Sequence, residues 1–104
     1  MPPVALRQTG EYDAATDVTV DGEGRFRVEL GGYVTARPRE GRLSARQRAA
    51  LARLAEAVDW TAAHPTAGAF QTSLSVGTGT ARWAGPPPTP ALAALVGALV
   101  SLGA

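Results

Sequence analysis

The chain has 104 residues, of which 45% are hydrophobic and 18% charged, and its formal net charge at pH 7 is +1. This balance excludes an intrinsically disordered protein, and the length provides one hydrophobic core, so we expect a single domain over residues 1–104. The chain contains no cysteine, which excludes disulfides, thiolate metal ligands and a cysteine nucleophile.

Neither a secretory signal nor a membrane span is expected. The N-terminus, Met1 to Val4, has no basic segment followed by an apolar one. The longest apolar run, Ala91 to Leu102, has 12 residues, whereas a helix needs about 20 to cross a bilayer. We therefore expect a cytoplasmic protein without a membrane partner.

The first third of the chain shows the period-two alternation that is typical of strands. Three such segments follow one another: Val4 to Gln8, the residues around Val18 and Val20, and Arg25 to Leu30. The glycines of DGEG, residues 21–24, suit a tight hairpin turn between the last two segments. We expect Gly31 and Gly32 to bend the third strand before it continues over Tyr33 to Ala36.

Two helices are predicted from their start signals. Ser44 and Gln47 have the spacing of a capping box, and the helix that Ser44 begins should run to about Asp59. Thr89 can cap a second helix that has Pro90 at its first position and reaches about Leu102. Apolar residues three and four positions apart give the first helix a stripe that should be buried: Leu51, Leu54, Ala55 and Val58.

A second hairpin is predicted between the two helices. The alternation puts Phe70 on the same strand face as Leu74, and GTG, residues 77–79, turns the chain into a strand from Thr80 to Ala84. The order of elements is therefore βββαββα. Short hairpin loops join antiparallel neighbours, so we predict an α+β domain with an antiparallel sheet of four to five strands and both helices packed on one face.

The sequence offers no recognisable catalytic motif. The chain has one histidine, His64, no HExxH pattern and no lysine, so the ligand set of a catalytic zinc and the lysine of a P-loop are missing. His64 precedes Pro65 in a loop, and we interpret it as a surface or helix-end residue. We expect a protein that is not an enzyme and that holds no metal and no cofactor.

Arginine is concentrated around the start of the first helix. One hypothesis is a basic patch for nucleic-acid phosphates or an acidic protein, made by Arg37, Arg39, Arg42 and Arg46. Two further arginines, Arg48 and Arg53, lie on opposite flanks of the helix at 100° per residue, and no aromatic residue is interleaved for base stacking. We favour a solvated face with arginine stems covering the helix edge, and weak nucleic-acid binding through residues 37–53 is a third functional alternative.

The last helix carries no charged residue. Its leucines form one broad face for the sheet, and its other side presents Ala93, Gly97 and Ser101 four residues apart. A glycine in mid-helix costs about 1 kcal/mol relative to alanine, which a close approach by another helix would explain. We hypothesise that this face packs on the first helix of the same chain or on its own copy in a homodimer; a merely exposed alanine face is the alternative.

Five segments together have the outline of a known family. They are a first strand ending in a glycine-containing loop, a hairpin, a helix opened by Leu-Ser, a strand starting at an aromatic and a proline-marked last helix: LRQTGEYDA, VTVDGEGRFRV, LSARQRAALARLAEAVDW, FQTSLSV and PPPTPALAALVGALVSL. Over nearly its whole length the chain resembles the emfourin-like family, small bacterial protein inhibitors of thermolysin-like (M4) zinc metallopeptidases, and their uncharacterised relatives. Where members commonly have a Gly-Gly-Phe loop, this chain has Gly10, Glu11 and Tyr12.

The resemblance implies a non-catalytic protein that binds and inhibits a zinc metallopeptidase. Such an inhibitor needs an exposed, rigid segment that enters the cleft, preferably with an acidic oxygen able to reach zinc. The loop from Thr9 to Asp17 is the candidate, with contact residues Gly10, Glu11, Tyr12 and Asp13. The leading alternative is a self-associating structural or scaffold domain that uses the last helix, in which case the loop is a plain solvated connection.

Overall fold

The computed structural model describes residues 2–10, 15–30, 38–68 and 70–102. The elements within these ranges are β1 (Val4–Thr9), β2 (Ala15–Val20), β3 (Arg25–Leu30), β4 (Arg39–Arg42), α1 (Ala45–Glu56), β5 (Gln71–Val76), β6 (Gly79–Ala84) and α2 (Pro90–Ser101).

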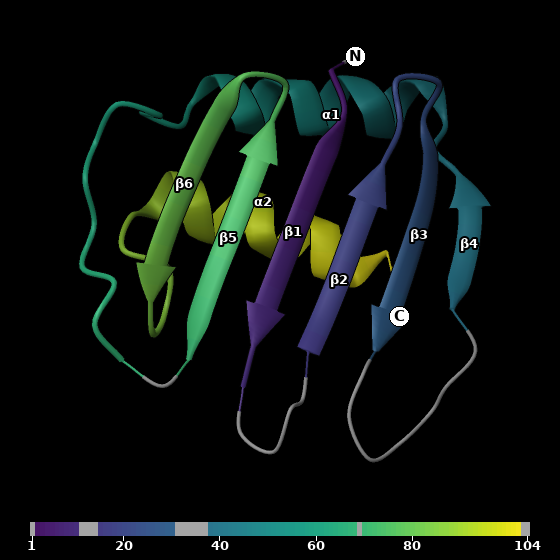
Figure 1. The fold of residues 1–104 in the computed structure, drawn as a ribbon. Coiled ribbons are helices and arrows are strands. Elements are labelled where there is room, and N and C mark those ends of the chain that lie inside the picture. The colour runs from purple at the N-terminus through teal and green to yellow at the C-terminus, as the bar shows by residue number, and fades with distance from the viewer. Residues whose placement is uncertain (1, 11–14, 31–37, 69, 103–104) are drawn as a thin grey trace.

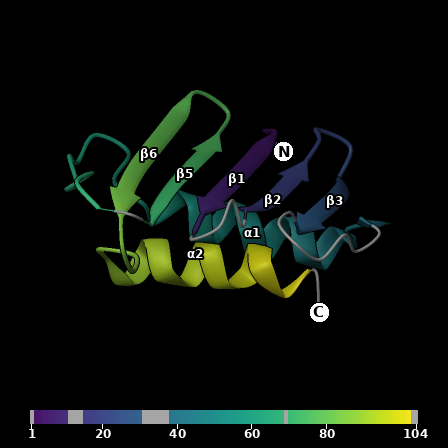
Figure 2. The same ribbon diagram turned by 60° about the horizontal axis from the view of Figure 1, so that its bottom comes forward.

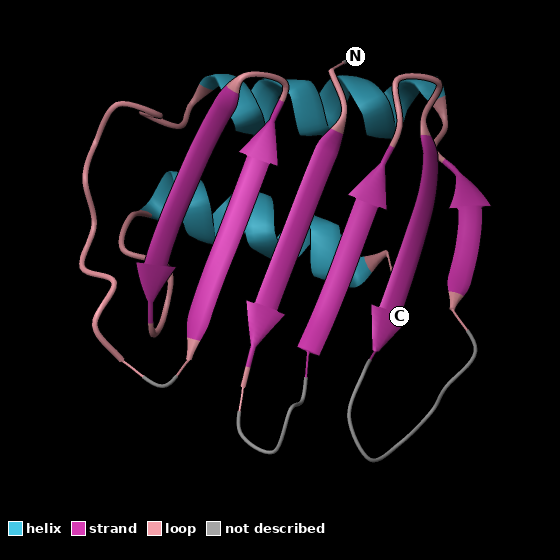
Figure 3. Cartoon of the chain, in the orientation of Figure 1, coloured by secondary structure: helices cyan, strands magenta, loops and turns pink. Residues whose placement is uncertain are grey.

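The strands form one antiparallel sheet in the order β4-β3-β2-β1-β5-β6 (Figures 1 and 3). β1 lies in the middle, where Val4 pairs with Val20 of β2 on one side and with Val76 of β5 on the other. Both helices cover the same face of the sheet and leave the other face open (Figure 2). The Cα extents, 36 × 35 × 20 Å, are those of a two-layer slab. The predicted α+β class and the antiparallel sheet with both helices on one face are confirmed.

The sheet has a sixth strand, β4, that the sequence analysis did not predict. Its sequence, REGR, has no apolar side chain to reveal an alternation. Gly41 pairs with Phe26 of β3, and a Cβ atom at Gly41 would lie 2.6 Å from the ring of Phe26. The Phe26 ring therefore occupies the space that an apolar side chain of β4 would need. The predicted strand continuation over Tyr33 to Ala36 lies outside the described residues.

Helix α1 begins as predicted and ends earlier. The capping box is confirmed, because Gln47 N donates to Ser44 Oγ at 3.1 Å and Ser44 N donates to Gln47 Oε1 at 2.8 Å. The helix ends at Glu56, before the predicted Asp59. The carbonyl of Ala55 accepts from Val58 N at 3.2 Å and from the indole Nε1 of Trp60 at 3.2 Å, so a further helical turn has lost its acceptor.

Helix α2 supplies most of the helical contribution to the core. Leu92 N donates to Thr89 Oγ1 at 3.2 Å, and Pro90 stands in the first turn, as predicted. The largest side chains that are less than 2% exposed come from the sheet and from α2: Trp83, Leu6, Leu74, Leu92, Leu95, Leu99, Val18 and Val20. No helix in the described part of the chain is long and apolar enough to span a membrane.

Candidate functional site

The predicted inhibitory loop is anchored at both ends by the two strands in the middle of the sheet. Thr9, at the end of β1, pairs with Ala15 of β2 and with Gln71 of β5, and Thr9 Oγ1 donates to Gln71 O at 3.2 Å. Gly10 is half-buried, whereas Glu11, Tyr12 and Asp13 lie outside the described residues. The anchors are rigid because β1 and β2 each bury their helix-facing side chains in the core.

An exposed aromatic lies at the same end of the sheet. Phe70 is 49% exposed and directly precedes Gln71, the partner of Thr9. Its carbonyl accepts from Gly85 N at 2.8 Å, which fixes the backbone while the ring stands in solvent. The predicted alternation included Phe70 with Leu74, but β5 begins at Gln71, so Phe70 lies outside the strand. We call Thr9, Gly10, Phe70, Gln71 and Gly85 the loop-end surface.

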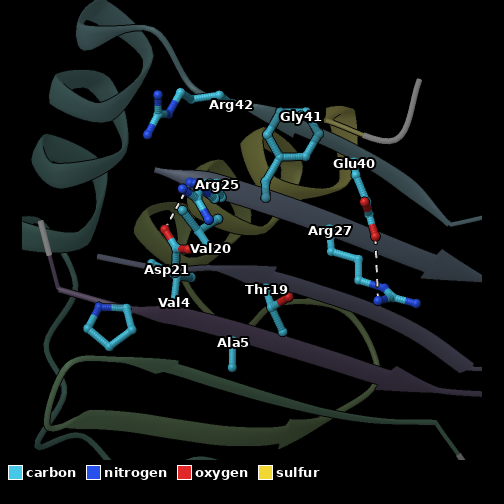
Figure 4. A pocket seen from close by; sticks show the side chains of 12 residues that line it. Val4, Ala5, Thr19, Val20, Asp21, Arg25, Arg27, Glu40, Gly41 and Arg42 are labelled. Carbon is cyan, nitrogen blue, oxygen red and sulfur yellow. Dashed lines mark hydrogen bonds and ion pairs between the residues drawn. The ribbon is translucent and has the colours of Figure 1, made fainter. Parts of the chain in front are cut away.

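The open face of the sheet carries a broad hollow of about 900 Å³ (Figure 4). The small side chains of Ala5 and Thr19 form its floor, and longer side chains surround them. Two of these, Arg27 and Glu40, pair at 3.4 Å, and Arg27 also pairs with Glu29 at 2.6 Å. These three side chains thus pair with one another, and each such exposed pair contributes only about 0–1 kcal/mol to stability.

Asp21 at the rim of the hollow is kept ionised by the hairpin turn. Its Oδ1 accepts from Arg25 N and from Glu23 N, each at 2.9 Å. The Arg25 N–H bond, and then the Glu23 N–H bond and the Arg25 charge, hold the pKa of Asp21 below its usual value. A carboxyl group with a lowered pKa is a poor general base or acid near pH 7, so we interpret this contact as turn stabilisation.

The predicted basic patch is divided between two elements. Arg37 lies outside the described residues, Arg39 and Arg42 are exposed on the edge strand β4, and Arg46 is exposed on α1. Arg42 forms an ion pair with Glu23, whose Oε2 lies 4.0 Å from Arg42 Nη2. Arg48 lays its stem along the β2–β3 hairpin: its Cδ would lie 2.8 Å from a Cβ atom at Gly24. This agrees with the expectation that an arginine stem covers the helix edge.

The small-residue face of α2 points away from the sheet. Ala93, Gly97 and Ser101 are exposed, and a methyl group added at Gly97 would meet nothing within 4 Å. The hypothesis that α1 packs closely on Gly97 was therefore wrong. The two helices instead line a shallow groove, to which α1 contributes Leu54 and α2 contributes Ala98. Contact with a second copy of the chain stays a prediction.

His64 has an acidic neighbour that its place in the sequence did not reveal. Asp59 Oδ1 accepts from the side chain of Thr61 at 2.6 Å and from its N–H at 3.0 Å. These two bonds, and to a smaller degree the charge of His64, lower the pKa of Asp59. His64 itself is half-buried, and its Nε2 has no hydrogen-bond partner. In the described ranges no three His, Cys, Asp or Glu side chains come together as metal ligands.

Comparison with known proteins does not add a family to this geometry: no protein-family model matches the chain, and no curated protein matches its sequence.

Proposed function

We propose that the protein is a non-catalytic binding protein that inhibits a zinc metallopeptidase of the thermolysin-like class through the loop-end surface and the loop that this surface carries. The partner class comes from the resemblance to the emfourin-like family. The single observation that carries the site is Phe70, a 49% exposed aromatic ring beside the anchors of the loop. Exposed aromatic residues on a fixed backbone are typical anchors of protein interfaces.

The rigidity of the loop anchors supports this proposal. An inhibitor that holds a segment ready for a cleft loses little conformational entropy on binding. Thr9 is tied to β2 by its register with Ala15 and to β5 by the bond from its hydroxyl to Gln71 O. Phe70 is tied to the end of β6 by the bond that its carbonyl accepts from Gly85. Strands on both sides thus hold the two ends of the segment that would enter the cleft.

The proposal is tested with a thermolysin-like peptidase and an equimolar amount of the protein. We expect loss of peptidase activity, and we expect Phe70→Ala and the double change Glu11→Ala with Asp13→Ala each to weaken inhibition by about tenfold or more, as loss of interface anchors does. The matched control is Val100→Ala, which removes a second exposed large apolar side chain in the described part of the chain, on α2. Full residual activity with a panel of such enzymes, or equal effects of Phe70→Ala and Val100→Ala, would contradict the proposal.

Self-association through α2 is a second candidate function. The observation that favours it is Val100, which is 42% exposed on a helix that carries no charge. Sedimentation velocity at increasing protein concentration measures it directly. We expect Val100→Glu to shift any dimer to monomer while Thr78→Glu, in the β5–β6 turn, leaves the dimer intact. A monomer at every concentration would refute this candidate.

A further inference from the structure

A second, smaller cavity of about 230 Å³ opens between the sheet and α1. Val4 and Val76 line it from the sheet, Leu51 from α1 and Leu95 from α2. Val4 is at the start of β1 and Val76 at the end of β5, so this cavity lies at the opposite end of the sheet from the loop-end surface. We call it the Trp60 pocket, after the aromatic residue that forms one of its walls.

The walls of the Trp60 pocket are fixed before any ligand arrives. Val4, Leu51 and Leu95 are 4%, 5% and 1% exposed, so they belong to the packed core. The Trp60 indole donates to Ala55 O at 3.2 Å and lies across Gly79, where a Cβ atom would come within 2.9 Å of the ring. The cavity therefore exists because the small residue Gly79 leaves room for the Trp60 ring, which a hydrogen bond holds in place. Binding of a ligand would require little rearrangement of these walls.

Among the described residues that line this cavity, one carries a charge and the others are apolar. It is Glu56, in the last turn of α1, and within the described ranges Glu56 makes no ion pair, whereas Glu23, Glu29 and Glu40 each have an arginine partner. Glu56 is exposed, so its carboxylate stands in water at the rim of the cavity, and an apolar ligand alone would fill the walls without using this charge. A ligand with a positive charge at one end complements both, and the face of a tryptophan also attracts cations.

From this arrangement we infer that the Trp60 pocket binds a small apolar compound that carries a primary ammonium group, such as an arylalkyl amine. The hydrocarbon part enters between Val4, Leu51 and Leu95, and the ammonium group stays at the rim beside Glu56. A cavity of this size holds only a ring and a short chain, so the dissociation constant should be on the order of 1 mM. The site is independent of the proposed peptidase contact, because the two lie at opposite ends of the sheet.

The test uses two probes with the same hydrocarbon skeleton and opposite charge, phenethylammonium and 3-phenylpropionate. Each is titrated into the ¹⁵N-labelled full chain while amide and indole resonances are followed. We expect phenethylammonium to cause saturable shifts at Ala52, Ala55 and the Trp60 indole. We expect 3-phenylpropionate to have a dissociation constant at least about fivefold higher. The ammonium probe should leave peptidase inhibition unchanged.

Two variants separate the pocket from nonspecific attraction. Glu56→Gln should weaken phenethylammonium binding by about two- to fivefold, the range of an exposed ion pair, and should abolish the preference between the probes. Glu40→Gln, which removes a carboxylate from the open sheet face, should leave both probes unaffected. The inference is overturned if no saturable shifts appear, if the two probes bind equally to the unmodified chain, or if the two variants behave alike.

Discussion

Helices α1 and α2 have the same length, 12 residues, and lie on the same face of the same sheet, yet they are built differently. Helix α1 buries two side chains, Leu51 and Ala55, and exposes arginines. Helix α2 buries Leu92, Leu95, Val96 and Leu99 and carries no charge. Both helices have capping hydrogen bonds, so from the difference in burial we expect α2 to be held chiefly by its apolar side chains and α1 to depend more on its capping box.

The largest expected effect comes from the apolar anchor of α2. Leu99 is 0% exposed, and Leu99→Ala should lower the free energy of unfolding by about 2–5 kcal/mol, since it removes buried methyl groups and leaves a cavity. Its neighbour Val100 is 42% exposed, so Val100→Ala should change stability by less than about 0.5 kcal/mol. Urea unfolding followed by circular dichroism measures both. If Leu54→Ala, at a half-buried position of α1, lowered the free energy of unfolding as much as Leu99→Ala, the contrast between the helices would be contradicted.

The second effect tests how far α1 depends on its cap. Ser44→Ala removes the hydroxyl that accepts from Gln47 N, and we expect it to cost about 1 kcal/mol of unfolding free energy. Thr89→Ala removes the matching acceptor of α2, which Leu92 N uses. If apolar burial dominates α2, the first turn of α1 in the Ser44→Ala variant should open at a lower temperature than the first turn of α2 in the Thr89→Ala variant. Hydrogen exchange of the first-turn amides distinguishes the two helices, and equal fraying would remove the distinction.

The third effect concerns the outward side of α2. Gly97 has open space where a Cβ atom would stand, so Gly97→Ala should stabilise the protein by up to about 1 kcal/mol through helix propensity. Ala49, on the exposed side of α1, provides the reverse control, because Ala49→Gly should destabilise by a similar amount. Thermal unfolding at a low protein concentration gives both values for the monomer. A destabilising Gly97→Ala would mean that something already packs on that glycine.

The sequence predicted those elements whose signals are local. The Ser44 and Gln47 capping box, the start of α2 at Thr89 and Pro90, and the buried alternation of β1 all agree with the structure. These signals depend on hydrogen bonds and burial within a few residues, so they can be recognised without knowing the rest of the fold.

The features that the sequence did not reveal depend on contacts between distant segments. Strand β4 is recognisable only when Gly41 is seen opposite Phe26. The exposure of Phe70 follows from where the ladder between β1 and β5 begins, and the Trp60 pocket exists because Gly79 and Ala55 come together around one ring. The sequence predicted a loop from Thr9 to Asp17, whereas Ala15 to Asp17 belong to β2, and the place of the anchor Thr9 next to Gln71 depends on the pairing of β1 with β5.

The smallest expected effect is a pH dependence at the C-terminal end of α1. The hydrogen bonds from Thr61 lower the pKa of Asp59, so the folded state favours the ionised carboxyl group. This contribution is present above the pKa of the unfolded chain, near 3.8, and is lost as the pH falls through the lower pKa of the folded state. Asp59→Asn should therefore lose less stability than the unmodified chain between pH 5 and about pH 3. Helix α2 has no acidic residue, so hydrogen exchange should show the difference between Asp59→Asn and the unmodified chain at the α1 amides near Asp59 and not at the amides of α2. Equal changes in both helices would assign the acid sensitivity to the whole fold.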